Sequence, residues 1–149
     1  MKTKNLKLIA TSEEDLRVIS AHLQDAIVLP IEIANLKKNR ILLIQLNRFM
    51  WEDVEKGVFR KNKRIRTVLK FDNVISVSSK NINQKSEKRF LDFLTIESTL
   101  MPDKSYEINL IFSGDAILKI KSEVLDVTLD DQGSPWESKA KPKHKFFNS

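Results

Sequence analysis

The sequence has no cysteine and only three glycines among its 149 residues. Without cysteine the chain can form neither disulfides nor thiolate metal sites, and it has no cysteine nucleophile. Three glycines are too few for a glycine-rich phosphate-binding loop, and neither a P-loop nor a dinucleotide-binding motif is present. These absences argue against several large classes of enzyme. The absence of cysteine fits a reducing compartment, so we expect a cytoplasmic protein. We also expect no cofactor.

Long hydrophobic runs are also missing. The apolar stretches AIVLPIEIANL and ILLIQL end well before the roughly 20 residues that a membrane-spanning helix requires. The basic start of the chain is followed too soon by Glu13, Glu14 and Asp15 for a signal peptide. We therefore predict a soluble protein with no membrane partner. It should be one domain over residues 1–149, of which residues 135–149 form a basic tail that is extended or disordered.

One amphipathic helix is clearly indicated near the start of the chain. Thr11 and Ser12 each stand three residues before an acid, Glu14 and Asp15 respectively, which is the pattern of a helix N-terminus. Apolar residues then recur at helical spacing, at Leu16, Ile19, Leu23 and Ala26. This spacing predicts a helix over residues 13–26.

Most of the remaining chain alternates between apolar and polar residues, as strands do. The predicted strands cover residues 6–10, 31–36, 41–47, 65–71, 74–79, 90–97, 106–112, 116–120 and 125–129. Asp72 with Asn73, and Ser113 with Gly114 and Asp115, are expected to form tight hairpin turns, and a bulge or corner should separate Ile120 from Leu125. About eight strands and one helix predict an α+β fold, mainly antiparallel, in which a strongly bent sheet or open barrel is covered by the helix.

The stretch LNRFMWE, residues 46–52, interrupts this alternation. The apolar residues lie at even positions up to Leu46 and at odd positions from Phe49 onward, so we expect a bulge, a corner or the end of the strand at Asn47 and Arg48. Such a site can turn Asn47 and Arg48 toward a pocket roofed by Trp51, with the guanidinium ready for a carboxylate or phosphate.

A structural interpretation of the same residues is favoured. In it Asn47 bonds the backbone at the bulge, Arg48 pairs with an acid such as Glu52 or Asp53, and Trp51 belongs to the core. Bulges mark sites in some proteins, but more often they only bend a sheet.

Histidine offers little for a metal site. His22 and Asp25 are neighbours on one face of the predicted helix, and the only other histidine is His144 in the tail. A zinc ion would need carboxylates from distant strands, so we predict no metal and interpret His22 as bonded to Asp25 or to a facing strand.

The net charge of +6 raises the question of a polyanion partner. The densest group of basic residues is Arg60, Lys61, Lys63, Arg64 and Arg66. These residues could contact phosphates, with Phe59 stacking on a base, but neither a recognition helix nor an aromatic strand motif accompanies them. A solvated loop is the preferred interpretation, and the charge itself also fits compositional drift toward lysine.

Trp136 lies between Pro135 and a basic, polar segment. An indole in such a segment either folds back onto the domain or contacts a partner. We favour docking on the same molecule, which would allow Trp51 and Trp136 to share one groove.

Several segments together resemble a family of small uncharacterised alphaproteobacterial proteins, a domain of unknown function. They are SAHLQDA, LNRFMWE, LKFDNVISVSS and DQGSPWESKAKPKH, in the same order and over nearly the whole chain. The resemblance implies a bacterial, cytoplasmic setting and no assigned activity. The last five residues, KFFNS, extend beyond the point where the pattern of the family is expected to end.

The main hypothesis is therefore a non-enzymatic cytoplasmic interaction domain that binds a protein partner or itself. Its candidate surface comprises His22, Asn47, Arg48, Trp51 and Trp136. One alternative is weak RNA or DNA binding through residues 60–66. Another is a small-ligand binder or an enzyme with a pocket near Arg48.

Overall fold

A computed structural model of the chain describes residues 5–52, 63–83 and 85–137. The described residues contain helix α1, two short 3-10 helices and ten strands, and Trp51 and Glu52 after β4 are helical as well. The elements in chain order are β1 (Lys7–Ala10), α1 (Glu13–Leu23), β2 (Ile27–Val28), η1 (Pro30–Glu32), β3 (Ile33–Leu36), η2 (Lys37–Asn39), β4 (Ile41–Phe49), β5 (Lys63–Phe71), β6 (Val74–Lys80), β7 (Leu91–Leu100), β8 (Tyr106–Phe112), β9 (Ala116–Ser122) and β10 (Val127–Glu137).

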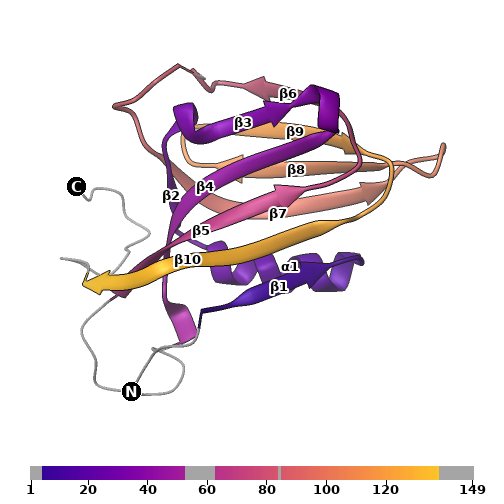
Figure 1. Cartoon of the computed structure of the whole chain (residues 1–149). Coiled ribbons are helices and arrows are strands. Elements are labelled where there is room, and N and C mark those ends of the chain that lie inside the picture. Colours follow the sequence, from indigo (N-terminus) through magenta and orange to yellow (C-terminus); the bar gives the residue numbers. More distant parts are fainter. Residues whose placement is uncertain (1–4, 53–62, 84, 138–149) are drawn as a thin grey trace.

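All ten strands belong to one antiparallel sheet, which bends around the core (Figure 1). Its order is β1-β10-β5-β4-β2-β7-β8-β9-β6, and β3 pairs with β4 beside this path. Because β1 and β6 stand at its two ends, the sheet does not close. The predicted α+β class, with a mainly antiparallel sheet and one helix near the N-terminus, is confirmed, with ten strands rather than about eight.

Helix α1 begins where the acidic pattern predicted. Ser12 is its N-cap, and the Ser12 hydroxyl accepts a hydrogen bond of 3.1 Å from the Asp15 N–H. The Asp15 carboxylate in turn accepts one of 3.2 Å from the Thr11 N–H, which completes a reciprocal cap. The helix ends at Leu23 rather than at residue 26, because Asp25 adopts a left-handed backbone with φ of 64° and the chain turns into β2.

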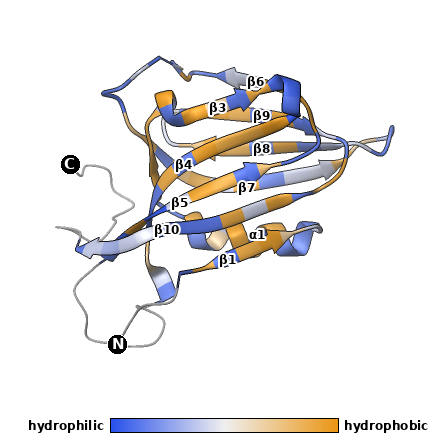
Figure 2. Cartoon of the chain, viewed as in Figure 1, coloured by the Kyte–Doolittle hydropathy of each residue, from blue (hydrophilic) through white to orange (hydrophobic). Residues whose placement is uncertain are grey.

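The apolar face of the sheet and that of α1 enclose one core (Figure 2). Strand β8 contributes Ile108, Leu110 and Phe112 at alternate positions, as the period of two predicted. The rings of Phe93 and Phe112 meet edge to face at 6.0 Å. The buried side of α1 consists of Leu16, Ile19 and Leu23. Arg48, Thr67 and Asp131 are polar residues of the strands that are nevertheless buried.

The turn at Asp72 and Asn73 is not a hairpin, so that prediction was wrong. Strand β5 pairs with β4 and β10, whereas β6 pairs with β9. Asn73 does adopt the expected left-handed backbone, with φ of 58°, but the chain turns a corner between two parts of the sheet. The predicted corner between β9 and β10 lies beside it, since the Glu123 N–H donates to the Asn73 carbonyl at 2.9 Å.

Strand β4 runs without a break through Asn47 and Arg48 and ends at Phe49, contrary to the bulge, corner or strand end predicted at Asn47 and Arg48. Its register with β5 is continuous from Leu42 opposite Phe71 to Phe49 opposite Arg64. Arg48 therefore stays on the same buried face as Leu46. Arg48 can occupy this inward position because the carboxylates of Asp131 and Glu52 neutralise its charge.

The C-terminal strand is longer than the alternation predicted. Strand β10 continues to Glu137, and Trp136 stands opposite Arg64 of β5. The rest of the predicted tail, residues 138–149, lies outside the described residues, as does most of the predicted loop over residues 52–64. Within the part of the chain that is described, no helix is long and apolar enough to cross a membrane.

Candidate functional site

Arg48 is fully buried at the end of β4 and binds two carboxylates. Its Nε and Nη2 donate to the two oxygens of Asp131 at 2.9 and 2.7 Å. Its Nη1 and Nη2 donate to the two oxygens of Glu52 at 3.0 and 2.8 Å, and Nη1 also approaches the Phe49 carbonyl at 3.4 Å. The five N–H donors of a guanidinium are thus all engaged. The pairing with Glu52 is the one that the structural interpretation of the sequence named.

Asp131 connects this arginine to the N-terminal strand. The Leu6 N–H donates to Asp131 Oδ2 at 2.9 Å, and the Asp131 N–H donates to the Leu6 carbonyl at the same distance. The Asp131 side chain has no exposed surface. We call Arg48, Glu52 and Asp131 the buried triad. It holds together β4, β10, the residue before β1 and the segment after β4.

The triad keeps all three groups charged. Burial acts to raise the pKa of Asp131 and of Glu52, but the hydrogen bonds from Arg48 outweigh it and lower both pKa values below their ordinary range. Burial acts to lower the pKa of Arg48, and the bonds to Asp131 and Glu52 raise it above its ordinary value. Groups whose pKa values are shifted away from neutral pH in this way suit a structural role better than proton transfer.

Trp51 and His22 lie beside the triad at the C-terminal end of α1. The Trp51 indole N–H donates to the Gln24 carbonyl at 2.9 Å, and its ring meets Phe49 edge to face at 4.6 Å. His22 Nδ1 lies 3.0 Å from the Val18 carbonyl, and the charge of His22 contributes to lowering the pKa of Glu52. The structure thus brings His22, Arg48 and Trp51 together.

Asn47 meets the same region through its backbone. It stands opposite Ile27 of β2, and its carbonyl accepts a hydrogen bond of 3.1 Å from Arg64 Nη1. The same Arg64 nitrogen reaches the Asp25 carbonyl at 3.3 Å, and the guanidinium lies 5.9 Å from the centre of the Phe49 ring. Burial lowers the pKa of Arg64. This arginine of β5 therefore joins the turn after α1 to β4.

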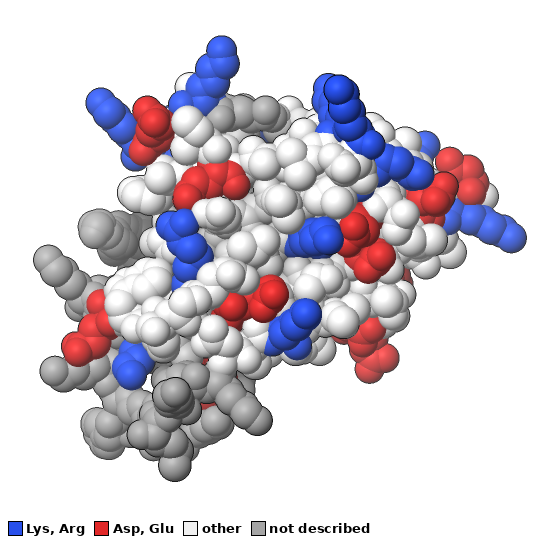
Figure 3. Space-filling model, in the orientation of Figure 1, with Lys and Arg blue, Asp and Glu red and all other residues white. Residues whose placement is uncertain are grey.

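The group of basic residues predicted from the sequence is only partly described. Arg60 and Lys61 lie outside the described residues, Arg64 is buried, and Lys63 is half-buried. Arg66 donates to Gln45 Oε1 at 2.7 Å and pairs with Glu32 at 3.5 Å. On the face shown in Figure 3, basic and acidic side chains are interleaved. The described part of this group does not form one free cationic surface.

Trp136 occupies a different environment from Trp51. Phe49 of β4 stands opposite Arg64 of β5, which stands opposite Trp136 of β10, so the three residues form a row across neighbouring strands. Of the surface of Trp136, 42% is exposed. The row connects the two tryptophans through Arg64 and Phe49. The fold thus gathers both at one end of the sheet, which the sequence could suggest only as a hypothesis.

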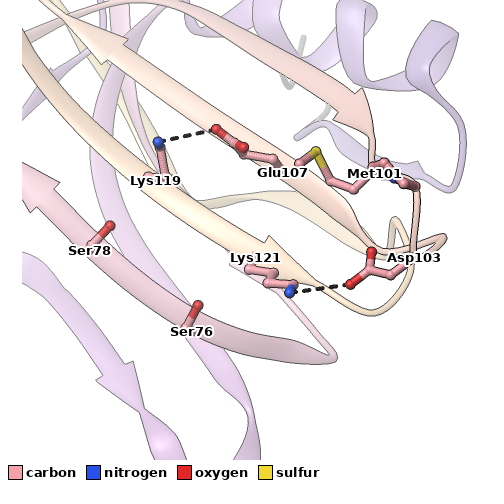
Figure 4. Close-up of a pocket in the computed structure, with 8 residues that line it drawn as sticks. Ser76, Ser78, Met101, Asp103, Glu107, Lys119 and Lys121 are labelled. Atoms are coloured by element: carbon pink, nitrogen blue, oxygen red, sulfur yellow. Dashed lines mark ion pairs between the residues drawn. The ribbon is translucent and has the colours of Figure 1, made fainter.

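A hollow of about 370 Å³ lies elsewhere, on the outer face of β6, β9 and β8 (Figure 4). Its lining residues are Ser76, Ser78, Met101, Pro102, Asp103, Glu107, Lys119 and Lys121. Lys119 pairs with Glu107 at 3.3 Å, and Lys121 pairs with Asp103 at 3.4 Å. Hydrogen bonds from Ser105 lower the pKa of Asp103 to about 2. In the sequence these residues are only the solvated positions of alternating strands.

Residues 6–144 match the model of a family described as "Protein of unknown function (DUF2948)". The chain belongs to this family. The match includes the buried triad, His22, both tryptophans and the hollow, and it ends before the final segment KFFNS, as the resemblance predicted. No curated protein and no solved structure matches the chain.

Within this DUF2948 chain the sequence analysis missed Asp131. It is one of several acids near a strand end, and no local pattern connects it with Arg48. The described residues contain no group of three or more His, Cys, Asp or Glu side chains that could hold a metal ion.

Proposed function

We propose that this protein is a non-enzymatic interaction domain that binds a protein partner or a second copy of itself. The contact surface is the end of the sheet that carries Trp51 and Trp136, with His22 and Asn47 beside it. The single observation that carries the proposal is the exposure of Trp136, at 42%, on β10, just after an irregularity in the pairing with β5 between Gln132 and Trp136. Exposed tryptophans are enriched at protein interfaces, where they dominate the binding energy.

The strand that carries Trp136 adds a second argument. Strand β1 pairs with β10 only from Val127 to Asp130, so the later part of β10 extends past its neighbour (Figure 1). In the described residues this edge is met by Leu6 and by the Asn5 side chain, which donates to the Gly133 carbonyl at 3.1 Å. Pro135 limits the addition of a further strand there. The indole, more than the backbone, is therefore the expected contact.

The buried triad supports this function as a scaffold. Arg48 holds Glu52 next to Trp51 and holds Asp131 in the middle of β10, so the segment after β4 and the centre of β10 are fixed before a partner arrives. A rigid surface loses less conformational entropy on binding. Arg48 belongs to the site in this positioning role, because its guanidinium is enclosed and fully engaged.

The other two candidate functions have less support. Nucleic-acid binding through residues 60–66 would have to proceed without Arg64, whose guanidinium faces backbone carbonyls inside the fold. A ligand pocket near Arg48 would require an accessible guanidinium, and Arg48 has no exposed surface.

Substitution of Trp136 tests the proposal. The matched control is I9S, which removes an exposed apolar side chain from β1. Analytical ultracentrifugation compares the self-association of the wild type, W136S and I9S. Affinity capture from an extract of the native host, with quantitative mass spectrometry, compares the proteins that they bind. We expect self-association, or capture of one defined protein, that is lost in W136S and retained in I9S. The proposal is wrong if W136S retains all associations of the wild type, or if the wild type shows none.

A further inference from the structure

The two strands nearest the opening of the sheet are β3 and β6. In the described residues β3 pairs only with β4, and β6 pairs only with β9. A hollow of about 440 Å³ is lined by residues of both, namely Asn35, Lys37, Arg40, Val74, Ile75, Ser76 and Val77. We call this groove the β3–β6 seam. A hollow of this size is within the range of ligand-binding sites.

The seam is held at both ends. At one end the Val74 N–H donates to the Arg40 carbonyl at 2.9 Å, and Arg40 Nε donates to the Val74 carbonyl at 3.3 Å. At the other end the Ile31 N–H donates to the Ser86 carbonyl at 3.2 Å. These bonds keep the strands near one another without pairing them along their length. Alternate backbone N–H and C=O groups of each strand therefore face the seam.

Apolar side chains give the seam a floor and a rim. Val77 lines the hollow and is partly buried against the core, as is Ile33 at the start of β3. Leu36 and Ile75 remain 40% and 50% exposed at its edges. An extended peptide added to a strand edge uses such positions for every second side chain.

The charge of the seam is positive. Its lining contains Lys37 and Arg40 and no carboxylate, and Lys38 lies in the same turn. Lys and Arg side chains gather over η2, at the end of β3 (Figure 3). Arg40 pairs with Glu123 at 3.7 Å between two exposed side chains. Glu123 offsets one of the three cations Lys37, Lys38 and Arg40, so the charge at this end of the seam stays positive.

We propose that the β3–β6 seam binds an extended acidic segment of a partner protein. The segment adds its backbone to the edge of β6, places apolar side chains against Ile75 and Leu36, and directs carboxylates to Lys37 and Lys38. A second copy of the chain fits less well, because two seams would bring the same cations together. The seam is separate from Trp136, so this inference does not rest on the surface of the proposed function.

Selection from a random peptide library displayed on phage tests the inference, with the full chain as bait. We expect enrichment of peptides that are rich in Asp and Glu and contain no proline. When one such peptide is synthesised and titrated into 15N-labelled protein, the backbone resonances of β3 and β6 should shift. The variant K37E/K38E should weaken the affinity by about tenfold or more, because two attractive charges become repulsive.

Controls distinguish this site from a general charge effect. K7E/K104E makes the same change in net charge at exposed lysines away from the seam and should retain the affinity, as should W136S. In a second control, the backbone nitrogens of the peptide are methylated one at a time. Methylation should abolish binding at every second residue, where the backbone N–H pairs with the edge of β6, and should have less effect at the residues between. The inference is overturned if no acidic peptide is enriched, if the shifts map to other strands, if K37E/K38E binds as the wild type does, or if the seam instead pairs two copies of the chain.

Discussion

Arg48 and Asp131 lie 83 positions apart in the chain, yet they form two parallel hydrogen bonds of 2.9 and 2.7 Å inside the fold. Neither side chain has exposed surface. The pair connects β4 to β10 across β5, and it also connects to the backbone of Leu6. A buried pair of this kind depends on both partners, since removal of one leaves an unneutralised charge in the interior.

We expect D131N to be much more damaging than E52Q. The change D131N leaves the buried guanidinium without its enclosed partner and should lower the free energy of unfolding by about 3 kcal/mol. Glu52 is partly exposed, at 21%, and glutamine can still accept one hydrogen bond, so E52Q should cost only about 1 kcal/mol. Urea denaturation followed by circular dichroism measures both. Equal costs for the two variants would contradict the central role of Asp131.

The stability of the protein should fall in acid through the same groups. The folded pKa values of Asp131 and Glu52 are lowered, so their contribution is complete above their ordinary values of 3.8 and 4.5 and is lost as the pH falls toward the folded values. In that range the unfolded chain binds more protons than the folded one, and the free energy of unfolding decreases. Denaturation between pH 7 and pH 3 measures this decrease.

The variant D131N supplies the control for the pH dependence. With one of the two carboxylates removed, its stability should fall less steeply below the ordinary pKa of Asp131 than that of the wild type. Exposed Asp103 also has a lowered pKa, so D103N is compared in parallel to separate its contribution. Identical slopes for wild type and D131N would show that the triad does not govern acid unfolding.

Local patterns predicted much of this fold, because they depend on residues close in the chain. The cap at Ser12 and the alternation of β8 follow from side-chain chemistry and from the period of a strand. The turn at Asn73 shows the limit. Its chemistry specifies a reversal of the backbone, but the partner of each strand is decided by the distant strands β9, β4 and β10.

The candidate site shows the same limit. Glu52 stands four residues after Arg48 and could be named as its partner, whereas Asp131 comes into contact only through the pairing of β5 with β10. The parity argument at Asn47 failed because it assumed that buried positions are apolar. Arg48 occupies such a position, since two carboxylates neutralise it.

The two tryptophans should differ in their access to solvent. In W51F the remaining Trp136 is 42% exposed, whereas in W136F the remaining Trp51 is partly buried and bonded to the Gln24 carbonyl. We expect a larger Stern–Volmer constant for acrylamide quenching and a longer emission wavelength in W51F. Unfolded samples of both variants in urea provide the reference. Equal quenching in the folded state would contradict the placement of Trp136 at the surface.

The turn between β8 and β9 should tolerate little change at Gly114. Its φ of 72° lies in the left-handed region, and no atom lies within 4 Å of the place that a Cβ would take. The cost of G114A is therefore one of backbone conformation alone, about 1 kcal/mol in the free energy of unfolding. Asp115 has a left-handed backbone too, with φ of 57°, so D115G relieves strain and should leave stability unchanged or slightly higher. Urea denaturation of both variants compares them, and a loss in D115G equal to that in G114A would show that the turn depends on the Asp115 side chain instead.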